Sequence, residues 1–212
     1  MKEQIAENLL RKEAVRVSMD PLFNWTSGIR SPIYCDNRKM ISFVEERKVV
    51  VAAFVEMVKA LPVQPEVIGG TATAAIPWAA FVAQAMDLPM IYIRPEKKEH
   101  GAGKQIEGHL EPRKRVLIVE DLISTGGSSV KAVEAVREEG GCVVEEVFAI
   151  VTYEMAKAEA RFAEANVKAS VLTDFSTLMA RAKEMGVLDE EQLAKVLEFG
   201  KDPAGWAEKM GI

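Results

Sequence analysis

The stretch "VLIVEDLISTGGSS", residues 116–129, decides the fold of this 212-residue chain. An apolar run leads into Glu120 and Asp121, and small residues fill positions 124–129. The apolar run is typical of a buried parallel strand, and apolar spacing over 130–136 predicts a helix after it. Open parallel sheets bind ligands at the carboxyl ends of their strands, so this turn is the first place to expect a site.

The same alternation of strand and helix continues outward from this unit. Strands are predicted at 66–70, 89–94, 115–120, 142–152 and 167–172. Helices are predicted at 2–17, 43–61, 74–86, 128–139 and 154–165, with only helices in 176–212. A short strand is predicted in "PIYCDN", residues 32–37, after a connector rich in Pro and Gly. This order favours an α/β fold with a parallel sheet covered on both faces.

We expect one domain over residues 1–212, since no repeat or low-complexity linker interrupts the chain. Within it, 1–40 would form a small hood segment, 41–175 the α/β core and 176–212 a helical C-terminal segment. The polar break at 95–114 is the one long loop expected inside the core, and loops of this length are usually functional or mobile.

Composition excludes several classes of protein. The net charge of −5, without a long block of Lys and Arg, argues against general nucleic-acid binding. Cys35 and Cys142 are too few for a zinc cluster or a disulfide framework, and we expect free thiols. No apolar stretch is long enough to cross a membrane, and the N-terminus lacks a signal-peptide core. We therefore expect a cytoplasmic protein with no membrane or nucleic-acid partner.

The small residues at 124–129 let backbone N–H groups converge on an anion at a helix N-terminus, which predicts a phosphate site. The segment lacks the lysine of a Walker loop and the G-x-G-x-x-G pattern of dinucleotide sites. Carboxylates beside a phosphate site need another partner, and ribose hydroxyls are suitable donors. A phosphorylated ribose would place its hydroxyls on Glu120 and Asp121. The alternative is an acidic strand end followed by an ordinary turn.

The stretch at 116–129 resembles the 5-phosphoribosyl-1-pyrophosphate motif of the type I phosphoribosyltransferases. Three further segments, "SGIRSPIYCDNR" (27–38), "GGTATAAIPWA" (69–79) and "RPEKKEHGAGKQIEG" (94–108), resemble the orotate phosphoribosyltransferases of that family. The resemblance covers about the whole chain. It implies the type I phosphoribosyltransferase fold. The implied reaction transfers the 5-phosphoribosyl group to orotate and releases orotidine 5′-monophosphate and pyrophosphate, a step of pyrimidine nucleotide biosynthesis.

The resemblance also implies roles for individual residues. The catalytic positions would be Asp121, Glu120, Lys98 and His100. The donor would be bound by Arg94, Lys98, His100, Glu120, Asp121, Leu122, Ile123, Ser124, Thr125, Gly126, Gly127 and Ser128. Pyrophosphate would meet the backbone at Thr71, Ala72 and Thr73, and orotate would meet Ser124 and Arg30.

The family further implies Mg²⁺ held mainly by substrate oxygens, with no direct protein ligand set. It implies a homodimer in which the cationic, Gly-rich segment around Lys98 closes as a lid over the neighbouring subunit's site.

Three positions depart from the family pattern. Pro95 stands where many relatives have a basic residue, and Lys97 is a candidate replacement. Thr26 stands where some have lysine, and Thr152–Tyr153 where some have arginine, so the orotate carboxylate needs another partner. Two alternatives stay open at this stage: a purine-base phosphoribosyltransferase, and a non-catalytic regulator that senses the phosphoribosyl donor.

Overall fold

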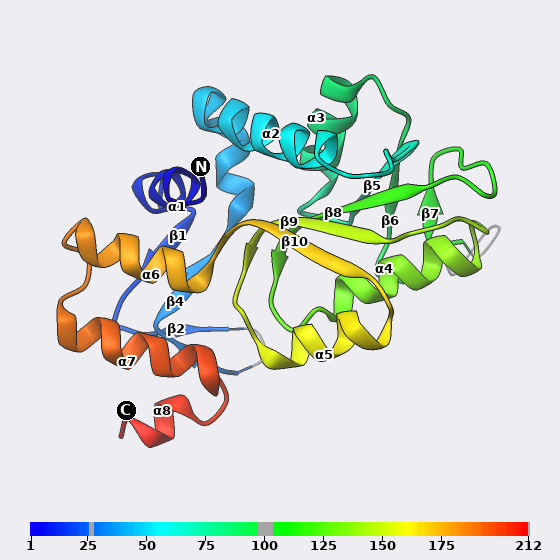
Figure 1. Ribbon diagram of the computed structural model, residues 1–212. Coiled ribbons are helices and arrows are strands. Elements are labelled where there is room, and N and C mark those ends of the chain that lie inside the picture. The colour runs from blue at the N-terminus through cyan, green and yellow to red at the C-terminus, as the bar shows by residue number, and fades with distance from the viewer. Residues whose placement is uncertain (26–27, 97–103, 212) are drawn as a thin grey trace.

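The computed structural model describes residues 1–25, 28–96 and 104–211. A six-stranded sheet with the strand order β10-β9-β8-β5-β6-β7 forms its centre (Figure 1). The strands are β5 Val67–Thr71, β6 Met90–Ile93, β7 Ile106–Glu107, β8 Val116–Ile123, β9 Glu146–Thr152 and β10 Lys168–Asp174. All neighbours pair in parallel except β7, which is antiparallel to β6 at the edge. The predicted central parallel sheet is confirmed.

Helices cover both faces of the sheet (Figure 1). The first face carries α1 Lys2–Arg11, α2 Val44–Lys59, α3 Ile76–Met86 and α6 Phe175–Glu184, and the second carries α4 Gly127–Glu138 and α5 Ala156–Glu164. Two hydrophobic cores result. Leu117 and Val119 of β8 belong to the first core, and Val116 and Ile118 to the second. This alternation is what a strand buried on both faces requires.

Two small antiparallel pairs form the hood at the N-terminal side. β1 Val15–Val17 pairs with β4 Ile33–Cys35, and β2 Phe23–Asn24 pairs with β3 Arg30–Ser31. The short strand expected in 32–37 is confirmed, but the helix predicted over 2–17 is wrong in its last part. It stops at Arg11 because Glu13 adopts a left-handed conformation with φ 53°, and the residues of 15–17 then pair as a strand.

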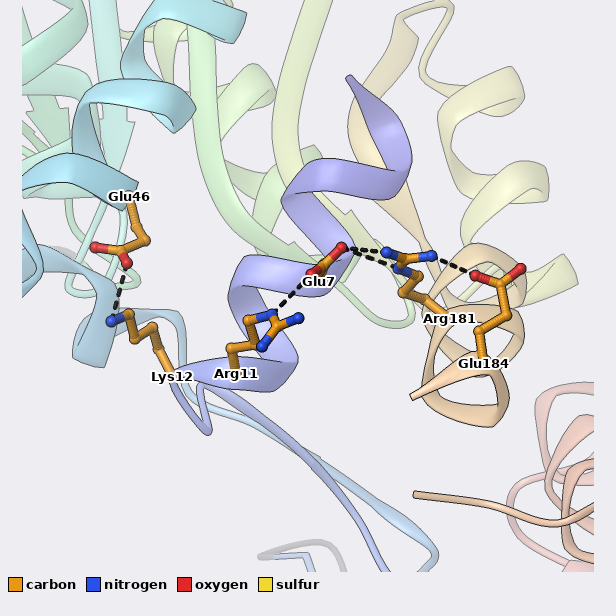
Figure 2. A network of polar contacts seen from close by, with 6 residues as sticks. All are labelled: Glu7, Arg11, Lys12, Glu46, Arg181 and Glu184. Atoms are coloured by element: carbon orange, nitrogen blue, oxygen red, sulfur yellow. Dashed lines mark hydrogen bonds and ion pairs between the residues drawn. The ribbon is translucent and has the colours of Figure 1, made fainter. Parts of the chain in front are cut away.

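Charged side chains tie α1 to its neighbours (Figure 2). The guanidinium of Arg181 on α6 binds the Glu7 carboxylate, which also accepts from Arg11 Nε at 2.7 Å. Lys12, just beyond α1, pairs with Glu46 on α2 at 2.9 Å. These pairs are partly exposed and contribute little energy each, so the buried residues of α1, such as Ile5 and Leu9, hold it in place.

The C-terminal segment is helical, as predicted. After α6 come α7 Glu190–Lys201 and α8 Trp206–Lys209. Trp206 is 1% exposed, and its Nε1 donates to the Lys195 carbonyl at 2.8 Å, which anchors α8 on α7. The two helices lie beside the hood, so the C-terminal segment reaches the same end of the sheet (Figure 1).

Three strand predictions need correction. β8 runs on to Ile123 instead of ending at Glu120, because Leu122 and Ile123 still pair with β9. β9 starts at Glu146, not at 142, since Val143 forms only an isolated bridge to Arg115. The predicted break at 95–114 contains β7, a two-residue strand too short to leave a periodic pattern.

No helix among the described residues is both long and apolar enough to cross a membrane.

Candidate active site

A cavity of about 870 Å³ opens at the carboxyl ends of β8 and β9. Four segments line it: the hood, the turn after β8, the start of α5 and the link between α7 and α8. The lining residues are Asn24, Trp25, Ile29, Tyr34, Cys35, Leu122, Ser124, Thr125, Tyr153, Met155, Ala156, Lys157, Gly200, Lys201, Asp202, Pro203 and Ala204. The cavity therefore lies where open α/β sheets bind their ligands.

The turn at 124–129 leads directly into α4 and presents a row of backbone amides. Gly126 caps the helix with φ +75°, and no side chain caps it. A Cβ at Gly126 would lie 3.2 Å from Phe162, so both conformation and packing require glycine there. The first amides of a helix have no intrahelical acceptor, and none is found for 124–129 within the described residues. These free amides at a helix N-terminus could bind an anion, which is the role that the sequence predicts for 124–129.

Glu120 lies on the α4 side of the sheet and is 5% exposed. Its Oε1 accepts from Thr71 Oγ1 at 2.6 Å and from the Asp121 amide at 3.1 Å. Its Oε2 accepts from Ser129 Oγ at 3.0 Å and from Ser128 Oγ at 3.2 Å. This carboxylate therefore joins the end of β5 to the start of α4. The hydroxyl of Ser128 is used for this link.

Asp121 lies beside the hood. Its backbone carbonyl accepts from Asn37 Nδ2 at 2.7 Å, and its charge acts on Cys35 and Tyr153, two residues of the cavity wall. Burial, followed by the neighbouring Glu120 charge, raises the pKa of Asp121 from 3.8 to about 7. The pairing of β8 with β9 skips Asp121, passing from Glu120 to Leu122. The half-buried carboxyl accepts hydrogen bonds from the backbone at Asp121 and Leu122 and shares one with the Glu120 side chain.

The loop between β5 and α3 contains Thr71, Ala72 and Thr73, the predicted pyrophosphate residues. The hydroxyl of Thr71 is bonded to Glu120, and the Ala72 amide donates to the Ile93 carbonyl at 2.8 Å. The amides of Thr73 and the next residue, Ala74, have no acceptor in the described part of the chain. Of the three predicted residues, Thr73 therefore has an open amide, and Ala74, which was not predicted, has another.

The predicted lid falls largely outside the described residues. Lys97, Lys98 and His100 lie in that part. Arg94 is described: it is half-buried and lies 3.6 Å from the Glu107 carboxylate. Its carbonyl accepts from Gln105 Nε2 at 3.0 Å, which joins the two ends of the lid segment.

Aromatic side chains form one wall of the cavity. Trp25 stacks on Tyr153 with a centroid separation of 5.3 Å and 12° between the rings. Trp25 Nε1 donates to the Ile33 carbonyl at 3.0 Å, which fixes the indole. Burial raises the pKa of Tyr153 well above its usual range, so its phenol stays neutral. Such a wall suits a flat, conjugated ring.

Arg30, the predicted orotate partner, is exposed on β3 and is not among the residues that line the cavity. Thr26 lies outside the described residues. The lining instead contains two lysines that the sequence did not single out, Lys157 at the start of α5 and Lys201 at the end of α7. Lys201 pairs with Glu198 at 2.5 Å, whereas Lys157 has no ion pair within the described ranges.

Among the residues described, no group of three or more His, Cys, Asp or Glu side chains could hold a metal ion. A cation at this site would need oxygen ligands from bound substrate, with the Asp121 carboxyl as one protein donor. That division is the usual one for Mg²⁺, which combines one or two carboxylates with substrate phosphates.

The chain resembles known proteins over nearly its full length. Residues 46–175 match the family described as the phosphoribosyl transferase domain. The chain is 46% identical to the orotate phosphoribosyltransferase of Lactococcus lactis subsp. cremoris, covering 95% of this chain and 96% of the relative. It is 43% identical to the enzyme of that name from Coxiella burnetii, covering 96% and 97%. The crystal structure of orotate phosphoribosyltransferase from Aeropyrum pernix superimposes with a TM-score of 0.74 at 28% identity, covering 87% of this chain and 99% of that one.

Proposed function

The chain belongs to the phosphoribosyl transferase domain family, and within it to the orotate phosphoribosyltransferases, and we propose from this how its residues divide the work of the reaction. The enzyme has the type I phosphoribosyltransferase fold. It transfers the 5-phosphoribosyl group from 5-phosphoribosyl-1-pyrophosphate to orotate, a step of pyrimidine nucleotide biosynthesis. The observation that carries the proposal is the row of acceptor-free amides at 124–129 between a buried carboxyl and an aromatic-walled cavity.

The amides of 124–129 bind the 5′-phosphate of the donor, and the N-terminus of α4 adds its positive dipole end. Binding the phosphate here fixes the ribose above the end of β8. The reacting carbon then lies near Asp121, with the base cavity on its other side. Catalysis of this kind depends mainly on positioning.

Asp121 supports the ribosyl centre. As the bond to pyrophosphate loosens, positive charge builds on the ribose, and a nearby carboxylate stabilises it. Glu120 is also proposed as a partner of the ribose hydroxyls. Because its oxygens already accept from Thr71, Ser128 and Ser129, ribose binding would replace one serine donor with a sugar hydroxyl.

The pyrophosphate leaving group is bound by the amides of 73–74 and by the cations of the lid, Arg94, Lys98 and His100. Closure of that segment would exclude water, which otherwise hydrolyses the donor. Mg²⁺, when bound through the substrate oxygens, supplies neutralisation of the leaving group's charge.

Orotate binds in the cavity with its ring against Trp25 and Tyr153 and its edge near Ser124. Its carboxylate needs a cation, and Lys157 is the lining lysine without an ion pair in the described ranges. We assign the carboxylate to Lys157 in addition to the exposed Arg30. If both contribute, Lys157→Ala and Arg30→Ala each raise the KM for orotate, and the double variant shows whether the two effects are independent.

Two further properties complete the proposal. The protein works as a homodimer whose lid reaches the partner's site, as the family resemblance implies. It works in the cytoplasm, which is consistent with its two free cysteines, the half-buried Cys35 and the buried Cys142.

The test measures consumption of orotate in the presence of 5-phosphoribosyl-1-pyrophosphate and Mg²⁺. The readout is the loss of orotate absorbance. Hypoxanthine, guanine and adenine are the comparison bases. Turnover of a purine in preference to orotate would indicate a purine-base phosphoribosyltransferase. Tight donor binding without turnover of any base would show a regulator.

A further inference from the structure

Arg161 of α5 reaches across to the phosphate loop, although nothing in the sequence motif includes it. Its Nη1 donates to the Thr125 carbonyl oxygen at 2.9 Å and to Thr125 Oγ1 at 3.1 Å. A Cβ placed on Gly127 would lie 2.9 Å from the same nitrogen. The guanidinium therefore covers the turn at the very start of α4.

The contact with the Thr125 carbonyl fixes the orientation of a whole peptide group. In a trans peptide the C=O and the following N–H point in opposite directions. Holding the carbonyl toward α5 therefore directs the Gly126 amide away from α5. That amide belongs to the acceptor-free row. If the peptide rotated, an oxygen would replace an N–H in the anion site.

Arg161 also brings charge. It has no ion-pair partner among the described residues, and it is half-buried, so its charge is screened less than that of a fully exposed arginine. Its two hydrogen bonds use only one of its nitrogens, although a guanidinium has five N–H donors. A dianionic phosphate bound on the adjacent amides would experience this charge directly.

We propose that Arg161 is a positioning residue for the donor's 5′-phosphate: it orients the Thr125–Gly126 peptide and supplies uncompensated positive charge behind the phosphate loop. This inference rests on the proposed function of that loop. It also means that α5 supports the loop, since Gly126 packs against Ala158 and Phe162 of this helix.

The experiment measures KM for each substrate, kcat and the binding of ribose 5-phosphate by calorimetry in Arg161→Gln and Arg161→Lys. Losing a hydrogen bond from a charged donor raises the KM for the phosphoribosyl donor and the Kd for ribose 5-phosphate by about 10- to 100-fold in Arg161→Gln. Arg161→Lys keeps the charge and shows a smaller increase. The KM for orotate changes less than about twofold in both, because the loop's other contacts remain.

Arg137→Gln is the matched control. Arg137 also binds carbonyl oxygens, among them those of Ala165 at 2.6 Å and Asn166 at 3.1 Å, but none in the phosphate loop. Its replacement lowers the melting temperature and leaves both KM values unchanged. This separates a loss of packing from a loss of phosphate binding.

The possible results distinguish a failure of the role of Arg161 from a failure of the proposed function. An unchanged donor KM and ribose 5-phosphate Kd in a folded Arg161→Gln would overturn the role of Arg161 while wild-type transfer to orotate stands. Equal rises in the KM for the donor and the KM for orotate would also overturn it. So would a donor KM that rises as much in Arg161→Lys as in Arg161→Gln, with an equal fall in melting temperature in both variants. Absence of orotate transfer in the wild type would overturn the proposed function itself.

Discussion

Replacing Asp121 by asparagine should stabilise the protein and at the same time remove most of its activity. The carboxyl has a folded-state pKa of about 7, against 3.8 ordinarily, because burial and the Glu120 charge disfavour ionisation. Folding therefore favours the protonated form. The contribution to stability is fully present below pH 3.8 and is lost as the pH rises through 7.

The magnitude follows from that rise in pKa. At pH well above 7 the ionised carboxyl costs at most about 4 kcal/mol, of which at most about 3 kcal/mol develops between pH 5 and pH 8.5. Asparagine keeps the shape and has no charge to bury. The free energy of unfolding of Asp121→Asn should therefore exceed that of the wild type at pH 8.5, with a difference that shrinks toward pH 5.

The assay is urea denaturation at both pH values, with turnover of orotate measured in parallel. Because the cationic ribosyl centre loses its counter-charge, kcat should fall by orders of magnitude in the variant. In the wild type, kcat/KM should rise with pH up to about 7 as Asp121 ionises, and the variant should lack this rise. A stability difference of the same size at both pH values would refute the pKa reasoning. Near-normal turnover would refute the catalytic role.

Asp174→Asn is the control with the opposite sign. Burial raises the pKa of Asp174, but hydrogen bonds from Lys2 and Thr177 outweigh it, so the net shift is downward. Its ionised form is thus favoured by folding, and stability from it is lost as the pH falls. This variant should be less stable than the wild type by a similar amount at pH 5 and pH 8.5, and the deficit should shrink only as the pH falls below 3.8.

Three other predictions test separate parts of the site. Gly127→Val should raise the KM for the phosphoribosyl donor far more than that for orotate, because its side chain would displace the Arg161 guanidinium, 2.9 Å from the new Cβ; equal rises would indicate a purely structural turn. Lys157→Ala should raise the KM for orotate by about tenfold and leave the donor KM unchanged. Mixing inactive Lys98→Ala and Asp121→Asn proteins should restore about a quarter of full activity if lids are shared in a two-fold dimer; no recovery despite subunit exchange would exclude sharing.

The strands of the sheet could be predicted because each is a short, continuous apolar run with β-branched residues, and burial on both faces imposes that pattern. Of the hood strands only β4 was predicted, within residues 32–37, and the other hood strands and β7 were not. These strands contain two or three residues each, as at Phe23–Asn24 and Ile106–Glu107. Runs this short cannot show an alternation of apolar and polar residues. Their pairing depends on what the folded chain brings beside them.

The candidate phosphate loop could be predicted because its glycines and small residues lie between a buried strand that ends in two acids and a helix. Its supports could not be predicted, because they come from distant parts of the chain. Thr71 meets Glu120 from 49 residues away, and Arg161 meets Thr125 from 36 residues away. An arginine within an amphipathic helix gives no sign of this contact, since the same pattern describes a solvated face. The same holds for Lys157 and for the cavity wall at 200–204.

The side chains of the two adjacent acids of β8 contact each other, but their other partners differ. Glu120, on the α4 side, has the longer side chain and reaches donors from both the β5 end and the phosphate loop. Asp121 accepts hydrogen bonds from the backbone at Asp121 and Leu122, but burial and the adjacent Glu120 carboxylate disfavour its charge. Glu120 therefore joins the two loops that we propose bind the phosphate groups of the donor, while the Asp121 carboxyl beside it is the group that we propose supports the ribosyl centre.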